Sequence, residues 1–149
     1  MSYTKLLYHI VFRTHKSQPT IPIDKEKILY TYIWKHIEKQ GGQLLRLGGM
    51  PDHIHMFVSL PPTLPLADFV RGIKMSTSSF LKHCQDFPTF DGWGKSYCAL
   101  TYSYLEKDKI INYIKNQKEH HKKISFREEY LNLLKEYGIE PDMTYFLKE

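Results

Sequence analysis

The segment 51–60 constrains the fold most strongly, because its residue types alternate along the chain. Apolar side chains occupy every second position: Ile54, Met56, Val58 and Leu60. His53 and His55 stand between them and share the other face, since successive side chains of a strand point to opposite sides. The pattern therefore predicts a strand with one apolar face and one face that carries two imidazoles.

The rest of the first hundred residues predicts a β-α-β-β-α-β order. Segments rich in β-branched and aromatic residues alternate with segments whose apolar residues have helical spacing. In chain order they are strand 6–13, helix 24–40, strand 43–47, strand 53–60, helix 66–84 and strand 97–104. We expect Asp24 to cap the first helix and Gly41 to end it. This order is typical of an α+β, ferredoxin-like split-βαβ fold, an antiparallel sheet with both helices on one face.

The C-terminal third of the chain predicts two further helices. Residues 107–123 form the first, and the capping-box pattern Ser125-Phe126-Arg127-Glu128 opens a second that ends near Gly138. We expect these helices to cover the sheet face that the first two leave open. The prediction is one domain over residues 1–149, with a sheet core at 1–104 and C-terminal helices at 107–149.

Composition narrows the class of protein only a little. With 42% hydrophobic and 14% aromatic residues the 149-residue chain can form a core. No apolar run approaches the ~20 residues of a membrane helix, and the N-terminus lacks a cationic leader with a cleavage site. Cys84 and Cys98 are expected to be free thiols in a reducing cytoplasm. The net charge of +5 weakly favours polyanionic partners.

His53 and His55 are candidate metal ligands. Side chains two apart on one strand face lie roughly 6 to 7 Å apart, which lets both rings converge on one cation. The alternative is that the two histidines simply line a solvated strand face. Tyr113 and Gln117 lie four residues apart on the helix predicted at 107–123, on a face that His120 and His121 continue. Tyr113 alone also fits a core aromatic with its hydroxyl at the rim.

The sequence resembles the single-tyrosine HUH transposases of the small insertion sequences of the 200/605 group. The resemblance spans nearly the whole chain, in residues and in spacing. It is carried by residues 8–13 (YHIVFR), 49–56 (GMPDHIHM), 73–79 (IKMSTSS) and 113–121 (YIKNQKEHH). The family's paired metal-binding histidines match His53 and His55, its nucleophilic tyrosine matches Tyr113, and the glutamine of its metal site matches Gln117. The chain departs from the family in reading Trp-Gly-Lys-Ser-Tyr at 93–97, where relatives often have Trp-Gln-x-Gly-Tyr.

The resemblance implies an enzyme that cleaves and rejoins single-stranded DNA at insertion-sequence ends through a 5'-phosphotyrosine. It also implies a divalent cation, Mg²⁺ or Mn²⁺, no nucleotide cofactor, and a homodimer in which the tyrosine helix sometimes lies against the partner's histidines. Hairpin DNA is the implied partner, and the implied place of action is the prokaryotic cytoplasm at the nucleoid. For contacts with nucleic acid the candidates are Arg13, Lys16, Arg46 and Lys74. Each of these cations also fits an ordinary solvated surface charge.

Two other functions remain open from the sequence. A catalytically idle relative would bind hairpin DNA or RNA, and a metal-dependent hydrolase would use water as nucleophile while Tyr113 stays structural. His9, His120 and His121 are further imidazoles that could reach the metal.

Overall fold

A four-stranded antiparallel sheet forms the middle layer of the computed structural model, which describes residues 2–148. Its strands are β1 (Leu7–Arg13), β2 (Gln43–Met50), β3 (His53–Ser59) and β4 (Cys98–Thr101), in the spatial order β2-β3-β1-β4. The β2 and β3 strands form a hairpin, and β1 lies between β3 and β4. The predicted α+β class and the order of its elements are confirmed.

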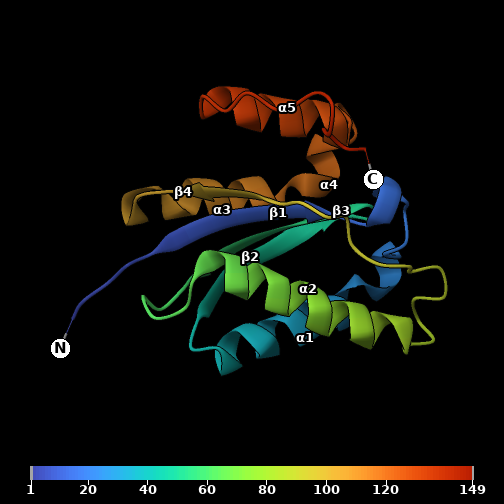
Figure 1. Ribbon diagram of the computed structural model, residues 1–149, viewed down its shortest axis with the longest axis horizontal. Helices are drawn as coiled ribbons and strands as arrows, with labels where there is room; N and C mark the ends of the chain where they lie inside the picture. Colours follow the sequence, from blue (N-terminus) through green and yellow to red (C-terminus); the bar gives the residue numbers. More distant parts are fainter. Residues whose placement is uncertain (1, 149) are drawn as a thin grey trace.

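Helices α1 (Glu26–Lys39) and α2 (Leu66–Lys82) cover one face of this sheet (Figure 1). The apolar set predicted from alternation, Ile54, Met56, Val58 and Leu60, is buried in the core between the sheet and these helices. Each fully buried side chain of this kind contributes roughly 1.5 to 3 kcal/mol relative to an exposed one. The alternating pattern therefore sets which face of β3 the two helices cover.

The C-terminal helices cover the opposite face, as expected (Figure 1). They are α3 (Lys107–Lys115), α4 (Gln117–His120) and α5 (Phe126–Glu136). The Ser125 hydroxyl accepts a hydrogen bond from the Glu128 amide at 3.2 Å, so the predicted N-cap of α5 is confirmed. Because helices lie on both sides, the histidine-bearing face of β3 is enclosed and not solvated.

Several predicted boundaries were wrong. The single helix expected at 107–123 is broken at Asn116 (φ −95°, ψ 18°), a residue type whose side chain competes with helical hydrogen bonds. Asp24 does not cap α1; it lies in the 3-10 turn Ile23–Lys25 that precedes the helix. The last strand is confined to Cys98–Thr101, since Ser103 already starts a turn by accepting a hydrogen bond from the Leu105 amide.

The second strand runs three residues further than predicted, through Gly48 and Gly49 to Met50. A Cβ atom on Gly48 would lie 2.6 Å from the carbonyl oxygen of Ile114 in α3. Gly48 therefore allows close packing of the α3 backbone on β2, whereas a Cβ atom on Gly49 would clash with the backbone of His53 in β3. Among the described residues no helix is long and apolar enough to cross a membrane.

Candidate metal centre and active site

The two histidines of β3 point into the space between the sheet and the C-terminal helices. Both side chains are fully buried, and the neighbouring strand β1 adds a third buried imidazole, His9. Buried polar groups of this kind must find partners within the protein. The contacts of the three rings therefore define the site.

His53 is oriented by a carboxylate. Its Nδ1 donates to Asp52 Oδ1 at 2.7 Å, and its Nε2 lies 3.2 Å from Gln117 Oε1 and 3.3 Å from Glu129 Oε1. Burial alone would lower the pKa of this imidazole, but the hydrogen bonds to Asp52 and Glu129 outweigh burial and raise the pKa. Asp52 thus fixes the ring so that Nε2 faces the centre of the cluster.

His55 is oriented by a second imidazole. Its Nδ1 lies 2.8 Å from His9 Nε2, and its Nε2 lies 3.0 Å from Glu129 Oε1. Burial lowers the pKa of His55 to about 4, against the opposing effect of Glu129, and burial beside His55 lowers that of His9 to about 3. Both rings are therefore neutral, with His9 donating to His55 Nδ1 and His55 donating to Glu129.

Glu129 completes this cluster, and no sequence pattern predicted it. It lies on α5, is 1% exposed, and its carboxylate accepts hydrogen bonds from His121 Nε2 at 3.0 Å, Gln117 Nε2 at 2.8 Å and the Tyr113 hydroxyl. Burial opposes ionisation, but the hydrogen bonds from the histidines outweigh burial and place its pKa far below the ordinary value. The available signal was an acidic residue within the apolar stripe of the helix, between Phe126 and Leu133.

The donor atoms at this centre fit a divalent cation. One ligand atom from each of His53, His55, His121 and Glu129 lies within 4.8 Å of every other. Imidazole nitrogen and carboxylate oxygen are the usual donors for such ions, and Gln117 Oε1 faces the same space. The buried cluster can therefore hold a metal.

Tyr113 lies on α3 at the edge of the cluster. Its ring centroid is 5.8 Å from that of His55 and 5.9 Å from that of His9, and its hydroxyl donates to Glu129. Burial and the neighbouring Glu129 carboxylate raise the pKa of this phenol. The side chain is only partly buried, so the hydroxyl is not enclosed in the apolar core.

The structure brings together His53, His55, Tyr113 and Gln117, all within one chain. It does not bring together the four cations predicted to contact nucleic acid. Arg13 is buried and donates to Ser17 Oγ at 2.8 Å, while Lys16 is exposed in the loop after β1. Arg46 is exposed on the β2 edge, and the half-buried Lys74 donates to the carbonyl oxygens of residues 94 and 96 near the opposite edge.

Comparison with known proteins places the chain in a family. The family model described as "Transposase IS200 like" matches residues 2–117. The ISDra2 transposase TnpA of Deinococcus radiodurans is 32% identical over 91 residues, which cover 57% of this chain and 65% of the relative. The chain thus aligns with a little under two thirds of that relative.

Solved structures show the same fold. A crystal structure from Deinococcus radiodurans R1 of a protein assigned to the transposases has 27% identity and a TM-score of 0.58, covering 78% of this chain and 93% of that one. A REP-associated tyrosine transposase bound to a REP hairpin has 14% identity and a TM-score of 0.61, covering 81% of this chain and 72% of that one. Since the family model spans most of the sequence, the chain belongs to the IS200-like transposase family.

Proposed function

We propose that this protein cleaves and rejoins single-stranded DNA at the ends of an insertion sequence through a covalent bond to Tyr113. The observation that carries the proposal is the position of the Tyr113 hydroxyl, which is hydrogen bonded to Glu129 inside the same cluster as His53 and His55. Family membership supports the substrate class, and the hairpin bound to the REP-associated relative supports hairpin DNA as the recognised form.

The metal site proposed from the resemblance uses His53, His55 and Gln117, and the cluster adds His121 and Glu129 as donors. When bound, the divalent cation would polarise a phosphate oxygen and offset the charge that develops in the transition state. The chain's own part is to hold its donors in place before substrate arrives. Asp52 orients His53, and His9 orients His55.

The proposed reaction begins with attack of the Tyr113 oxygen on phosphorus. The bond from phosphorus to the 3'-oxygen breaks, leaving a 5'-phosphotyrosine and a free 3'-hydroxyl. Because the raised pKa keeps the phenol protonated at rest, its proton must leave during attack, and Glu129 Oε2 already accepts that hydrogen bond. The departing 3'-oxygen takes up a proton, so charge and atoms balance.

Rejoining reverses these bonds. A second 3'-hydroxyl attacks the phosphotyrosine, the bond to Tyr113 breaks, and the phenol regains a proton. The phosphotyrosine retains the energy of the broken DNA link, so the reaction needs no ATP.

Covalent capture tests the proposal. The protein is incubated with Mn²⁺ and single-stranded DNA that carries the element end, and the products are separated on a denaturing gel. We expect a protein–DNA adduct with the wild type and with Tyr104→Phe, a matched change at an exposed tyrosine, but not with Tyr113→Phe. Cleavage without an adduct would favour the hydrolase, and binding without cleavage would favour the idle hairpin-binding protein.

We further propose a homodimer in which each active site is built from one chain, as here. A mixture of Tyr113→Phe and His53→Ala proteins tests this arrangement. If both parts of a site come from one chain, neither subunit of the mixed dimer is complete and no adduct forms. Restored adduct formation would show instead that the tyrosine acts on the partner's histidines.

A further inference from the structure

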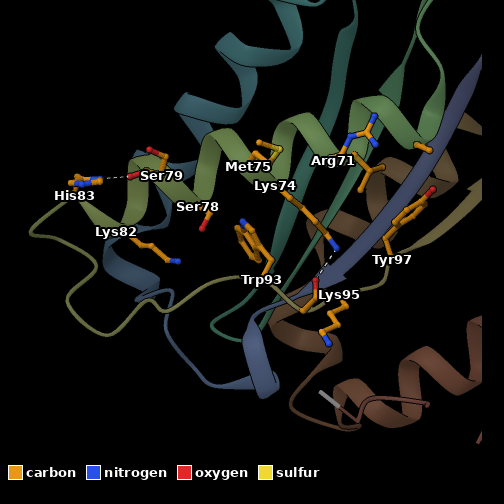
Figure 2. A pocket seen from close by; sticks show the side chains of 13 residues that line it. Arg71, Lys74, Met75, Ser78, Ser79, Lys82, His83, Trp93, Lys95 and Tyr97 are labelled. Atoms are coloured by element: carbon orange, nitrogen blue, oxygen red, sulfur yellow. Dashed lines mark hydrogen bonds between the residues drawn. The ribbon is translucent and has the colours of Figure 1, made fainter. Parts of the chain in front are cut away.

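A groove of about 810 Å³ lies between α2 and the loop of residues 93–97, on the side of the sheet away from the histidine cluster. Figure 2 shows the side chains of Arg71, Lys74 and Lys82 extending from α2, with Trp93, Lys95 and Tyr97 on the facing loop. The loop is the run 93–97 that departs from the family pattern. Nothing in the proposed chemistry at Tyr113 uses this surface.

The groove is held open by fixed contacts. The Lys74 ammonium donates to the carbonyl oxygens of Gly94 and Ser96, both at 2.9 Å. Trp93 Nε1 donates to Thr77 Oγ1 at 2.8 Å, which fixes the loop to α2 at a second point. A surface ordered in this way loses little conformational entropy when it binds a ligand.

Its chemistry combines cations with apolar and aromatic surface. Arg71, Lys82 and Lys95 are exposed around the groove, Met75 is 68% exposed within it, and Tyr97 is partly exposed. None of the described residues that line the groove is acidic; Asp68, the partner of Arg71, lies outside the lining. Surfaces that bind single strands typically combine two kinds of side chain: cations that reach phosphates, and apolar or aromatic groups that stack on bases.

The groove lies beside the C-terminal end of β1, and the metal centre lies beside the same end on the other face of the sheet. The amide of Gly94 donates to the carbonyl oxygen of Arg13 at 2.8 Å, and Arg13 pairs with His53 across β1 and β3. The loop that forms one wall is thus hydrogen bonded to the end of β1, and this end of β1 pairs with the histidine-bearing end of β3. A flexible strand that leaves the groove around this end would approach His53 on the other face.

We infer that this groove binds unpaired nucleotides of the single-stranded DNA that flank the cleaved phosphodiester. The inference rests on the proposed function for the identity of its ligand. Arg71, Lys82 and Lys95 contact phosphates, Tyr97 and Met75 contact bases, and Lys74 is a positioning residue that holds the loop.

The test measures binding separately from cleavage. Fluorescence anisotropy follows the wild type and its variants on fluorescein-labelled oligothymidine, which forms no hairpin, in buffer with EDTA. The groove variant is Arg71→Ala/Lys82→Ala/Lys95→Ala, and its control, Lys27→Ala/Lys35→Ala/Lys39→Ala, removes three exposed cations from α1 and has the same net charge. A salt series is recorded for each protein.

We expect the groove variant to lose at least about tenfold in affinity and its salt slope to fall by about 2, since each phosphate contact to single-stranded DNA contributes about 0.7. Tyr97→Leu keeps an apolar side chain and should lose about tenfold without a change in slope. Equal losses in the groove and control variants would overturn the inference, because they would reflect net charge alone. Competition by polyglutamate as effective as that by DNA would also overturn it.

The outcome is separable from that of the covalent assay. If Tyr113→Phe abolishes the adduct while the groove variant binds oligothymidine like the wild type, the proposed function stands and the groove is excluded. If no adduct forms with any protein but the groove variant alone loses binding, the groove stands and the proposed chemistry fails. A thermal melt of each variant shows that it is folded at the assay temperature.

Discussion

Replacing Glu129 by glutamine tests the centre most directly, because the change removes a charge and leaves the shape of the side chain. The carboxylate accepts hydrogen bonds from His55, His121, Gln117 and Tyr113. A glutamine carbonyl has two lone pairs and can keep at most two of these bonds, while its amide NH₂ meets other donors. The metal-free protein should therefore be less stable than the wild type.

The size of the loss follows from two opposing effects. Two hydrogen bonds to a charged group are worth about 1.5 to 3 kcal/mol each, and removing the buried charge recovers part of its desolvation cost. We expect a net loss of about 3 kcal/mol. For a chain of this length each kcal/mol changes the melting temperature by roughly 2 to 4 °C, so the melting temperature should fall by about 6 to 12 °C.

The assay is urea unfolding and thermal melting in EDTA, followed by the same measurements with Mn²⁺. At about 100 times its Kd, a bound ion stabilises the wild type by about 2.7 kcal/mol, and the variant should gain less. Glu128→Gln, one residue earlier and exposed, is the matched control and should change stability by no more than about 1 kcal/mol. If Glu129→Gln is as stable as the wild type in EDTA and gains the same stabilisation from Mn²⁺, the carboxylate neither organises the cluster nor binds the ion.

Further changes test the packing that supports the centre and the role of the metal. Ser125→Ala removes the N-cap of α5 and should cost about 1 kcal/mol in urea unfolding; an unchanged midpoint would show that the cap does not hold the helix. Gly48→Ala places a Cβ atom 2.6 Å from the Ile114 carbonyl oxygen, so it should lower the free energy of unfolding by about 1 to 3 kcal/mol and reduce adduct formation. The control Gly72→Ala, with open space around it, should be neutral or stabilising. Adding EDTA should abolish adduct formation, and His55→Ala should abolish the stabilisation by Mn²⁺. Adduct formation in EDTA, or stabilisation of His55→Ala by Mn²⁺, would show that the reaction does not depend on a metal bound at this cluster.

The elements of this fold could be predicted from sequence because their patterns are local. The alternation at 53–60 and the helical spacing in 66–84 each report on a buried face, and both faces are buried as predicted. The extension of β2 through Gly48 could not be predicted, since it depends on the approach of α3, a helix more than fifty residues later.

The candidate site, too, could be predicted from the sequence only in part. His53 and His55 could be placed together because they share one strand face, and the resemblance added Tyr113 and Gln117. Glu129 could not be placed from spacing alone, because its contacts with β3 join residues 74 positions apart. Its position depends on where α5 lies over the sheet, which no local pattern determines.

Glu129 lies beyond residues 2–117, which match the family model. The shared part of the chain supplies neutral imidazole and amide donors, whereas the tail adds one negative charge to the donor set. A divalent ion in such a set presents one net positive charge to a phosphate, and in a neutral set it presents two. In the proposed metal site, Glu129 would therefore hold the ion more firmly and would weaken its pull on the phosphate.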